Sequence, residues 1–541
     1  MLKIENLSFS YPSGEQVLKN INLELDKGFF SLVGASGCGK STLCLTLNGL
    51  IPQEISGKLE GKVLINGKDT QKYMIKDLAT EVGIIFQNPE SQLFSLCAED
   101  EIAFGPGNLG LPWEEVKKRV SNILKGLNIE YLRNKSPEEM SSGEKQKIAI
   151  ASVLAMNPKI LVLDEPTANL DPKSSEEIFK ILKEISKEKL IFLTEHDIDK
   201  IARYSDEVAV MHEGKIVMIG QPKEIINEKL SEYIYPPKIV RLGLKLGIKP
   251  LFLTAEEMAS SIKLKKVPDF LKKAQKHKDI IIEIKNLSFE YSKNQPILKN
   301  INLNIYKGEF LAIVGANGSG KTTLALHFNG LLKPSKGSVI VNGVNTKKTK
   351  VSKLAKSVGY VFQNPDQQIF EDNLVREIGF GVKNLGINIE DVSEKVNEVI
   401  KYTGLRKYKT QDPFSLSLGQ KRRVTIASIL AMEPQVIILD EPSTGLDLRT
   451  TENIMNLVRS LNKSGHTIIM ITHDMELVAQ YAERVIVLSE GKIISDEITT
   501  KTFTKQNILE KSRLQRPEIN KLGFLLGESR ILTIDDILKL V

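Results

Sequence analysis

Two glycine-rich stretches of this chain have the residue types and spacing that bind the phosphates of a nucleotide. Each follows the pattern G-x-x-x-x-G-K-[S/T] and lies between an apolar run, which predicts a strand, and a segment that predicts a helix. The glycines let the backbone fold tightly enough for successive N–H groups to point at phosphate oxygens, and a helix N-terminus adds positive charge. The two stretches are Gly34, Ala35, Ser36, Gly37, Cys38, Gly39, Lys40, Ser41 and Thr42, and Gly315, Ala316, Asn317, Gly318, Ser319, Gly320, Lys321, Thr322 and Thr323.

The residues that close each stretch have separate tasks in such a site. Lys40 and Lys321 can reach the β- and γ-phosphates, and the hydroxyls of Ser41 and Thr322 can hold Mg²⁺. One such stretch could be a chance glycine turn in a structural loop, but its repetition in a single chain argues against that interpretation. A nucleotide with at least three phosphates, together with Mg²⁺, is therefore the predicted ligand of both stretches.

An acid pair ends another predicted strand in each half of the chain. The pairs are Asp164 with Glu165 and Asp440 with Glu441, and both follow apolar runs. Acids at the carboxyl end of a strand lie where α/β sheets bind their ligands. We expect each aspartate to bind Mg²⁺ through water and each glutamate to orient or deprotonate the attacking water. A single pair could be an ordinary surface feature, whereas two matched pairs favour catalysis.

A histidine closes the next predicted strand of each half, His196 in the first and His473 in the second. A lone histidine is usually structural, but the same context in both halves favours contact with the γ-phosphate. The rest of the chain repeats in the same way: residues 4–9 (IENLSF) return at 284–289 (IKNLSF), and matched positions keep a nearly constant offset. The chain is therefore a tandem duplication.

The duplication sets the predicted domain boundaries. A P-x-I-x-x-L-G pattern begins at Pro237 and again at Pro517, so each half is predicted to end in a small C-terminal module. Strands that alternate with helices, among them a helix over 113–127, predict a mainly parallel α/β core beside antiparallel strands. The first module and its linker are basic but the second copy is not, so the charge is not expected to be central to the role that the modules share. Only residues 262–279 or thereabouts are then expected to be true linker. The predicted domains are 1–234 and 280–512 for nucleotide binding, 235–279 for the first module with its linker, and 513–541 for the second module.

Composition restricts the class of protein. The chain has 541 residues, of which 41% are hydrophobic and 26% charged, as in soluble globular proteins of several domains. No apolar run approaches the roughly 18 residues that span a bilayer, and the N-terminus lacks a signal-peptide layout. The net charge of +7 supports neither a nucleic-acid nor a membrane surface, and the three cysteines have no metal or disulfide spacing. We expect a cytoplasmic chain that reaches any membrane through a partner.

With these motifs in order, the chain resembles tandem ATP-binding-cassette (ABC) proteins over nearly all of both halves. Gln87 and Gln363 match the family's Q-loop glutamine, a metal contact, and Tyr11 and Tyr291 match the aromatic residue that stacks on adenine. The resemblance implies that the nucleotide is ATP and that the protein is an ATPase. It also implies two P-loop NTPase domains of the α/β class, each with an antiparallel β subdomain, a helical subdomain and a small C-terminal module.

The family's signature, L-S-G-G-Q, is matched once in each half. In the family two cassettes pair head to tail, so each signature closes the nucleotide site of the other half. The residues implied are Ser417, Gly419 and Gln420 for the Lys40 site, and Ser141, Gly143 and Glu144 for the Lys321 site. Because Glu144 replaces the usual glutamine, it adds negative charge near a phosphate. We therefore expect the Lys321 site to be weaker, although both sites should hydrolyse ATP.

Cys38 takes the position that Ser319 has in the second half. Usually only the backbone contributes at this position, which favours an inert small residue. The alternative is a thiol whose pKa is lowered by the adjoining phosphate site.

A further run narrows the resemblance. Residues 88–94 (NPESQLF) and 364–370 (NPDQQIF) resemble a run of energy-coupling-factor ATPases, which drive uptake of vitamins or of cobalt and nickel ions. This implies an import ATPase for a thiamine- or hydroxymethylpyrimidine-like vitamin or for a metal ion. The implied partners are an integral membrane coupling protein and a substrate-binding membrane protein, with this chain peripheral on the cytoplasmic face of a prokaryotic membrane. Leu93 with Phe94, and Ile369 with Phe370, are expected to help line the docking groove.

Three other interpretations remain open from the sequence. Soluble tandem cassettes that act on ribosomes or DNA usually carry a long charged helical linker, a basic tail or a cysteine-rich region, and this sequence shows none of these. ATPases of exporters or of amino-acid importers share the same motifs. A purely structural or regulatory nucleotide-binding role is the third interpretation.

Overall fold

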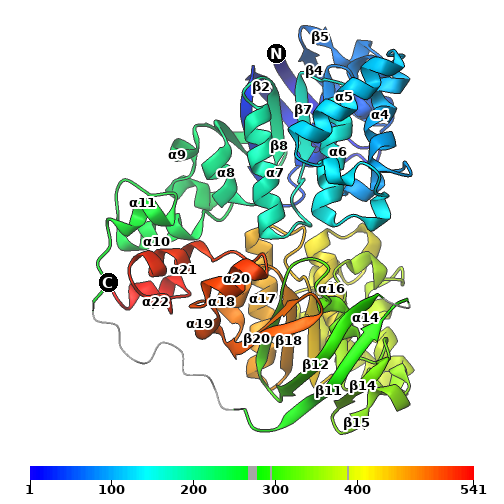
Figure 1. Ribbon diagram of the computed structural model, residues 1–541, viewed down its shortest axis with the longest axis vertical. Coiled ribbons are helices and arrows are strands. Elements are labelled where there is room, and N and C mark those ends of the chain that lie inside the picture. Colours follow the sequence, from blue (N-terminus) through cyan, green and yellow to red (C-terminus); the bar gives the residue numbers. More distant parts are fainter. Residues whose placement is uncertain (266–276, 293–294, 387–388) are drawn as a thin grey trace. The chain divides into compact units, whose positions relative to one another are not determined.

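The computed structural model describes residues 1–265, 277–292, 295–386 and 389–541. They form two compact units, Met1–Thr254 and Ala255–Val541. Each unit contains a four-stranded antiparallel sheet, a six-stranded mixed sheet and surrounding helices (Figure 1). The predicted linker at 262–279 lies partly outside the described residues, at 266–276.

In the first unit the small sheet has the order β2-β1-β4-β5 and the large sheet the order β10-β9-β3-β8-β7-β6. The strands are β1 (Leu2–Ser10), β2 (Gln16–Leu25), β3 (Gly28–Gly34), β4 (Lys58–Ile65), β5 (Lys68–Asp69), β6 (Val82–Ile85), β7 (Ile160–Asp164), β8 (Leu190–Thr194), β9 (Glu207–His212) and β10 (Lys215–Gly220). The helices are α1 (Lys40–Leu47), α2 (Leu50–Gln53), α3 (Ile75–Leu78), α4 (Ala98–Asn108), α5 (Trp113–Gly126), α6 (Ser142–Ala155), α7 (Pro172–Ile185), α8 (Ile198–Tyr204), α9 (Pro222–Ile225) and α10 (Lys238–Leu246).

The second unit repeats this plan, with sheets β12-β11-β14-β15 and β16-β17-β18-β13-β19-β20. Its strands are β11 (Ile280–Glu290), β12 (Pro296–Tyr306), β13 (Phe310–Val314), β14 (Lys336–Val341), β15 (Val344–Asn345), β16 (Val358–Val361), β17 (Val436–Asp440), β18 (Thr467–Thr472), β19 (Arg484–Ser489) and β20 (Lys492–Ile498). Its helices are α11 (Ala255–Ala259), α12 (Lys321–Leu326), α13 (Val351–Leu354), α14 (Leu374–Asn384), α15 (Ile389–Tyr402), α16 (Leu418–Leu430), α17 (Leu448–Lys463), α18 (Met475–Tyr481), α19 (Thr499–Thr502), α20 (Gln506–Lys511), α21 (Glu518–Leu525) and α22 (Ile534–Leu538).

The central strands are apolar throughout because both faces of each large sheet are covered. Successive residues of β7 alternate between two buried clusters: Val162 packs with Phe30 and Phe192, whereas Leu161 packs with Phe29 and others on the opposite face. The parallel pairs β7–β8 and β17–β18 bring their carboxyl ends to one edge, so Asp164 lies opposite Thr194. The acid pairs and histidines of each unit therefore meet at this edge.

The helical part of each unit forms a separate small core. In α5 the residues Val116, Val120 and Leu124 are buried against α4 and α6, which confirms the helix predicted over 113–127 to within one residue. The predicted fold class is likewise confirmed, with α/β domains that each join an antiparallel sheet and a helical part. Among the described residues, no helix is both long and apolar enough to cross a membrane.

The unit boundary falls inside the segment predicted as the first C-terminal module. Helix α11 packs against α21 within the second unit. The backbone N–H of Ala255 donates to the Glu518 carboxylate at 3.1 Å, and the Lys521 ammonium lies 2.6 Å from Glu256. The division into two modules at 235–279 and 513–541 stays a prediction.

Candidate ATP-hydrolysis sites

Each glycine-rich stretch folds around its own lysine. Gly39 and Gly320 precede the helices with φ of 110° and 100°, a conformation that favours glycine. The Lys40 ammonium donates to the carbonyls of Gly34 at 3.0 Å and Ala35 at 3.3 Å. Lys321 makes the same two bonds, at 2.9 and 3.0 Å, to the first two carbonyls of its loop. Both ammonium groups are buried at the centre of a loop, where a phosphate group would find them.

A hydroxyl and a carboxylate face each other beside each lysine. In the second unit Thr322 Oγ1 donates to Asp440 Oδ2 at 2.9 Å. In the first unit Ser41 hydrogen-bonds to Asp164. Burial raises the pKa of both aspartates. These oxygen donors are those that Mg²⁺ prefers.

One atom in particular fits a cation. Within the described part of the chain, Asp440 Oδ1 is buried without a hydrogen-bond partner. A buried carboxylate oxygen that lacks a partner is costly, and a bound cation would remove that cost. The residues present therefore fit Mg²⁺ bound together with a nucleotide.

The two glutamates that follow these aspartates share an uncommon backbone. Glu165 and Glu441 have φ of 47° and 46°, in the left-handed region that few residues other than glycine adopt. Such strain persists only where the surroundings hold it, and it gathers at functional sites. In the first unit, Glu165 accepts from the Gln87 amide at 2.8 Å and lies 2.7 Å from His196 Nε2 and 3.9 Å from Lys40 Nζ.

The catalytic candidates of the second unit meet through a different contact. Glu441 lies 2.9 Å from His473 Nδ1 and accepts from the Thr472 hydroxyl at 3.2 Å. Burial opposes both charges, yet the facing partner outweighs it: the pKa of Glu441 is lowered and that of His473 is raised. The backbone carbonyl of Gln363 accepts from the buried Arg422 guanidinium at 2.6 Å. The structure thus joins Gln87 to the catalytic group, whereas Gln363 is held through its backbone.

The adenine-stacking candidates stand beside the loops. The Tyr11 hydroxyl lies 3.2 Å from Thr42 Oγ1, and the Tyr291 hydroxyl lies 3.4 Å from Thr323 Oγ1. Each ring packs edge-on against a phenylalanine of the same strand region, Phe9 or Phe289, at centroid distances of 5.0 and 4.9 Å. Tyr291 is 62% exposed, so its ring is accessible for a base to stack, whereas Tyr11 is only partly exposed.

The signature residues begin long helices in both units. Ser141 caps α6 and Ser417 caps α16, and each shares a capping box with the residue three positions on. Close packing explains the glycines: a Cβ at Gly143 would lie 2.8 Å from Ser174 Oγ, and one at Gly419 would lie 2.5 Å from Thr450 Cγ2.

The two capping boxes differ in the residue three positions after the serine, which is Glu144 in the first unit and Gln420 in the second. Both the N–H and the hydroxyl of Ser141 donate to Glu144 at 2.8 Å, and Lys135 lies 3.5 Å from the same carboxylate. Burial opposes the charge of Glu144, but these partners outweigh it and lower its pKa. In the second unit only the N–H of Ser417 donates to Gln420, at 2.9 Å. The Glu144 charge is thus compensated, and the Ser141 hydroxyl is occupied.

Two expectations from the sequence are corrected. Cys38 is 7% exposed, and burial raises the pKa of its thiol, so the alternative of a lowered pKa is wrong. Ile369 is only 3% exposed and packs in the core of the helical part, where Leu93 also packs in the first unit. Of the four apolar residues expected to line the groove, only the two phenylalanines are exposed, Phe94 at 64% and Phe370 at 55%.

Sequence reasoning missed residues that hold these groups. Glu195 is fully buried and accepts the N–H groups of Thr167 at 3.2 Å and His196 at 2.8 Å; burial raises its pKa. Thr194 and Tyr360 donate hydroxyl bonds to the two aspartates. Aligning the two halves position by position could have pointed to Glu195, Thr194 and Tyr360, because the matched positions of the other half hold different residue types.

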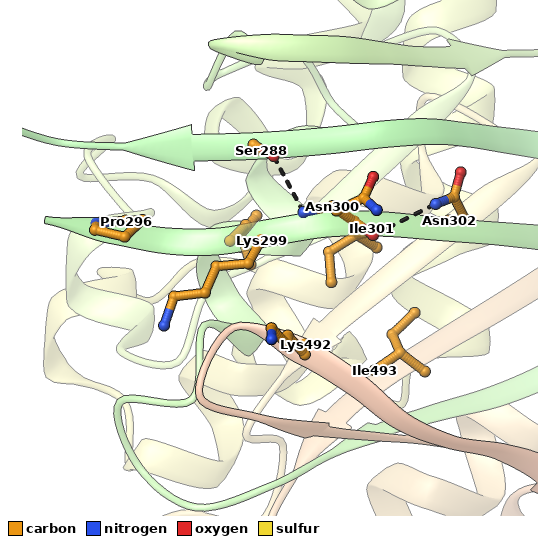
Figure 2. Close-up of a pocket in the computed structure, with 9 residues that line it drawn as sticks. Ser288, Pro296, Lys299, Asn300, Ile301, Asn302, Lys492 and Ile493 are labelled. Atoms are coloured by element: carbon orange, nitrogen blue, oxygen red, sulfur yellow. Dashed lines mark hydrogen bonds between the residues drawn. The ribbon is translucent and has the colours of Figure 1, made fainter. Parts of the chain in front are cut away.

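A pocket of about 650 Å³ lies elsewhere in the second unit, along β12 and β20 (Figure 2). Its polar groups are partly used: the N–H of Asn300 donates to Ser288 at 3.0 Å, and the Asn302 amide donates to the Asn300 carbonyl at 3.4 Å. Among the described residues that line it there is no acidic side chain.

The fold and the paired sites define a class of protein, an ATPase with two P-loop domains in one chain. The family model described as ABC transporter matches residues 18–168 and 298–444. A protein of Methanosarcina mazei, named provisionally as an ABC transporter ATP-binding protein, is 41% identical over 97% of this chain and 94% of its own length. One of Caldanaerobacter subterraneus subsp. tengcongensis, with the same provisional name, is 41% identical over 97% and 96%.

The chain therefore belongs to the ABC transporter family. It is a tandem ABC ATPase that binds ATP with Mg²⁺ and hydrolyses ATP. Among solved structures, cbiO1 from Clostridium perfringens, part of the ABC transporter complex cbiONQ, is 38% identical over 46% of this chain and all of that chain, with a TM-score of 0.41. An ATP-binding cassette bound to ADP and Pi is 31% identical over 40% and 98%, with a TM-score of 0.38.

Proposed function

We propose that this chain is the ATPase subunit of an energy-coupling-factor type importer, which takes up a thiamine- or hydroxymethylpyrimidine-like vitamin or a cobalt or nickel ion. One observation carries the proposal. The run N-P-[D/E]-x-Q-[L/I]-F follows both Q-loop glutamines and presents an exposed aromatic ring in each unit. Exposed apolar side chains in matched positions suit docking of a partner protein.

The exposed rings are held in place. Phe94 packs edge-on against Phe104 with centroids 4.6 Å apart, and Phe370 packs against Phe380 in the same way at 4.4 Å. Each follows the Q-loop closely, and Gln87 donates to Glu165, so a partner that moves this segment would also move a group at the catalytic carboxylate. This link supports coupling to an integral membrane protein, with this chain peripheral on the cytoplasmic face.

The residues of one site divide the work of hydrolysis. Lys40 and the loop N–H groups bind the β- and γ-phosphates, and Glu165 takes a proton from the attacking water. His196, fixed by Glu165, contacts the γ-phosphate. Ser41, Asp164 and Gln87 would hold Mg²⁺, which would supply positive charge to the phosphate oxygens.

Each site is proposed to be completed by the other half. Ser417, Gly419 and Gln420 would close the Lys40 site, and Ser141, Gly143 and Glu144 would close the Lys321 site. Hydrolysis would then depend on the two halves meeting, because the transition-state charge lacks its full set of donors until they close.

Purification from membranes tests the transport role. The tagged full-length chain, isolated in mild detergent from its native cells, is expected to bring two integral membrane proteins, one for coupling and one for substrate. Its ATP hydrolysis should depend on them. Recovery of ribosomes or DNA instead, with hydrolysis stimulated by them and not by membrane proteins, would favour the soluble alternative. The counterpart of this test is growth on limiting vitamin, which should fail when Glu165 and Glu441 are both replaced by glutamine.

The Glu144→Gln variant is expected to raise the ATP affinity of the Lys321 site by about two- to tenfold. It removes a negative charge and frees the Ser141 hydroxyl, and one hydrogen bond is worth about 0.5–1.5 kcal/mol. Photolabelling with an azido-ATP, followed by cleavage between the halves, measures each site separately. The matched control is Gln420→Glu, which should weaken the Lys40 site. A Glu144→Gln variant with unchanged or weaker labelling at Lys321 would show that the acid does not limit this site.

A further inference from the structure

In the second unit a buried tyrosine holds the aspartate assigned to Mg²⁺. Tyr360 lies on β16, beside β17, is 5% exposed and packs against Phe362. Its hydroxyl donates to Asp440 Oδ2 at 2.7 Å, the oxygen that also accepts from Thr322. Both bonds go to one oxygen, and Oδ1 stays buried without a hydrogen bond in the described part of the chain.

The first unit supplies the same bond from the opposite neighbour. Here Thr194, on β8, donates to Asp164 Oδ1 at 2.6 Å. The strand register shows that the two units take this donor from opposite neighbours. On one side, Thr194 stands opposite Asp164 in the first unit, and Ile471 stands opposite Asp440 in the second. On the other side, Tyr360 pairs with β17 in the second unit, and Ile84 pairs with β7 in the first. Each aspartate thus has one hydroxyl donor from a flanking strand, on one side in the first unit and on the other side in the second.

We propose that Tyr360 and Thr194 are positioning residues that orient the metal-binding aspartate of their own unit. This rests on the proposed assignment of Asp164 and Asp440 to Mg²⁺. A carboxylate held through one oxygen keeps the other turned to the cation, whereas a carboxylate without that bond loses the orientation. Loss of such outer partners typically weakens metal binding by about 10–100-fold.

The position of the donor strand also explains why the donor is a threonine in the first unit and a tyrosine in the second. A threonine directly opposite the aspartate is close enough for its short side chain to reach, as the register of Thr194 shows. Where that position is Ile471, the side chain opposite Asp440 has no hydroxyl, and the hydroxyl of the next residue, Thr472, donates to Glu441 instead. The longer tyrosine reaches Asp440 from β16. Ile471 takes the place of Thr194, and Ile84 takes the place of Tyr360, and neither isoleucine has a hydroxyl. In the described part of each unit, the donor therefore comes from one flanking strand.

Metal binding tests the proposal without turnover. In a Lys40→Ala background, which removes nucleotide from the first site, Mn²⁺ binding with a non-hydrolysable ATP analogue is followed by the electron paramagnetic resonance of free Mn²⁺. Tyr360→Phe is expected to weaken Mn²⁺ binding about tenfold, and Ile471→Thr added to it should restore binding to within about twofold. The control is Tyr402→Phe, whose exposed hydroxyl bonds Ser460 and which should change nothing.

The outcomes separate the inference from its premise. Unchanged Mn²⁺ affinity in Tyr360→Phe overturns the inference, and so does a loss that Ile471→Thr fails to rescue, since only packing would then be at work. Unchanged affinity in Asp440→Asn would instead overturn the assignment of the aspartate itself. If Tyr360→Phe does not fold, the first unit decides: in a Lys321→Ala background, Thr194→Val should weaken Mn²⁺ binding about tenfold, and no change there overturns the inference.

Discussion

Replacing Glu165 and Glu441 together by glutamine is expected to lower ATP hydrolysis by about 10²–10⁴-fold, the usual contribution of a general base. Each glutamate occupies a strained backbone position at the end of a central strand, and each lies within 2.9 Å of a histidine nitrogen. Glutamine keeps the shape but accepts no proton. Nucleotide binding should therefore persist while turnover is lost, and steady-state phosphate release with equilibrium ATP binding measures the two separately.

Replacing one glutamate at a time shows which of the two sites hydrolyses ATP. Because both units hold the same set of groups, Glu165→Gln and Glu441→Gln are each expected to lose at least half of the turnover. A matched control is Glu114→Gln, an exposed residue on α5 whose side chain is 86% accessible. A single variant with full turnover would show that its site does not hydrolyse ATP.

The Gly34→Ala variant should disable the first nucleotide site. A Cβ at this position would lie 2.4 Å from the carbonyl oxygen of Met211 and 2.6 Å from Cys38 Sγ. That carbonyl belongs to β9, which is paired with β3, so the backbone has little room to move. Overpacking of this kind costs about 1–3 kcal/mol, which corresponds to about 5- to 150-fold in an equilibrium constant. The ATP affinity of the first site should therefore decrease by about 5- to 150-fold, and the melting temperature of the protein should also decrease.

A second glycine provides the matched control. At Gly126, at the end of α5, an added Cβ would meet no atom of the described residues within 4 Å. Gly126→Ala should leave ATP binding unchanged and keep or slightly raise stability, since alanine favours the helix. Equal ATP affinity in Gly34→Ala and in the unsubstituted chain would contradict the close packing described for the loop.

The sequence was sufficient for the groups that act directly on the nucleotide. Lys40, Asp164 and Glu165 stand in short motifs whose chemistry needs those types at that spacing, and the same motifs recur in the second half. The fold class followed from the same source, because apolar runs that end in such acids are typical of strands in an α/β sheet. The structure places the Glu165 carboxylate within 4 Å of both Lys40 Nζ and His196 Nε2, as these motifs predict.

The supporting residues could not be found in this way. Tyr360 and Thr194 occupy strand positions that look like ordinary core. The strand register shows that Thr194 stands opposite Asp164, and the hydrogen bond to Asp440 shows the role of Tyr360. The pKa of Cys38 depends on burial, which the motif does not encode. The run predicts that Ile369 helps to line the docking groove, whereas the chain after the short helical turn at 365–367 buries its side chain.

The central claim is that each ATP site is shared between the halves, and a charged signature variant tests it most directly. In Ser417→Arg the proposed closure of the Lys40 site is blocked. Vanadate-trapped azido-nucleotide is then located after cleavage in the segment between the halves. Trapping is expected to be lost at the first-half loop, nearly four hundred residues away along the chain, and to be retained at the second-half loop. Loss at the Lys321 loop alone, with the Lys40 loop unaffected, would contradict it.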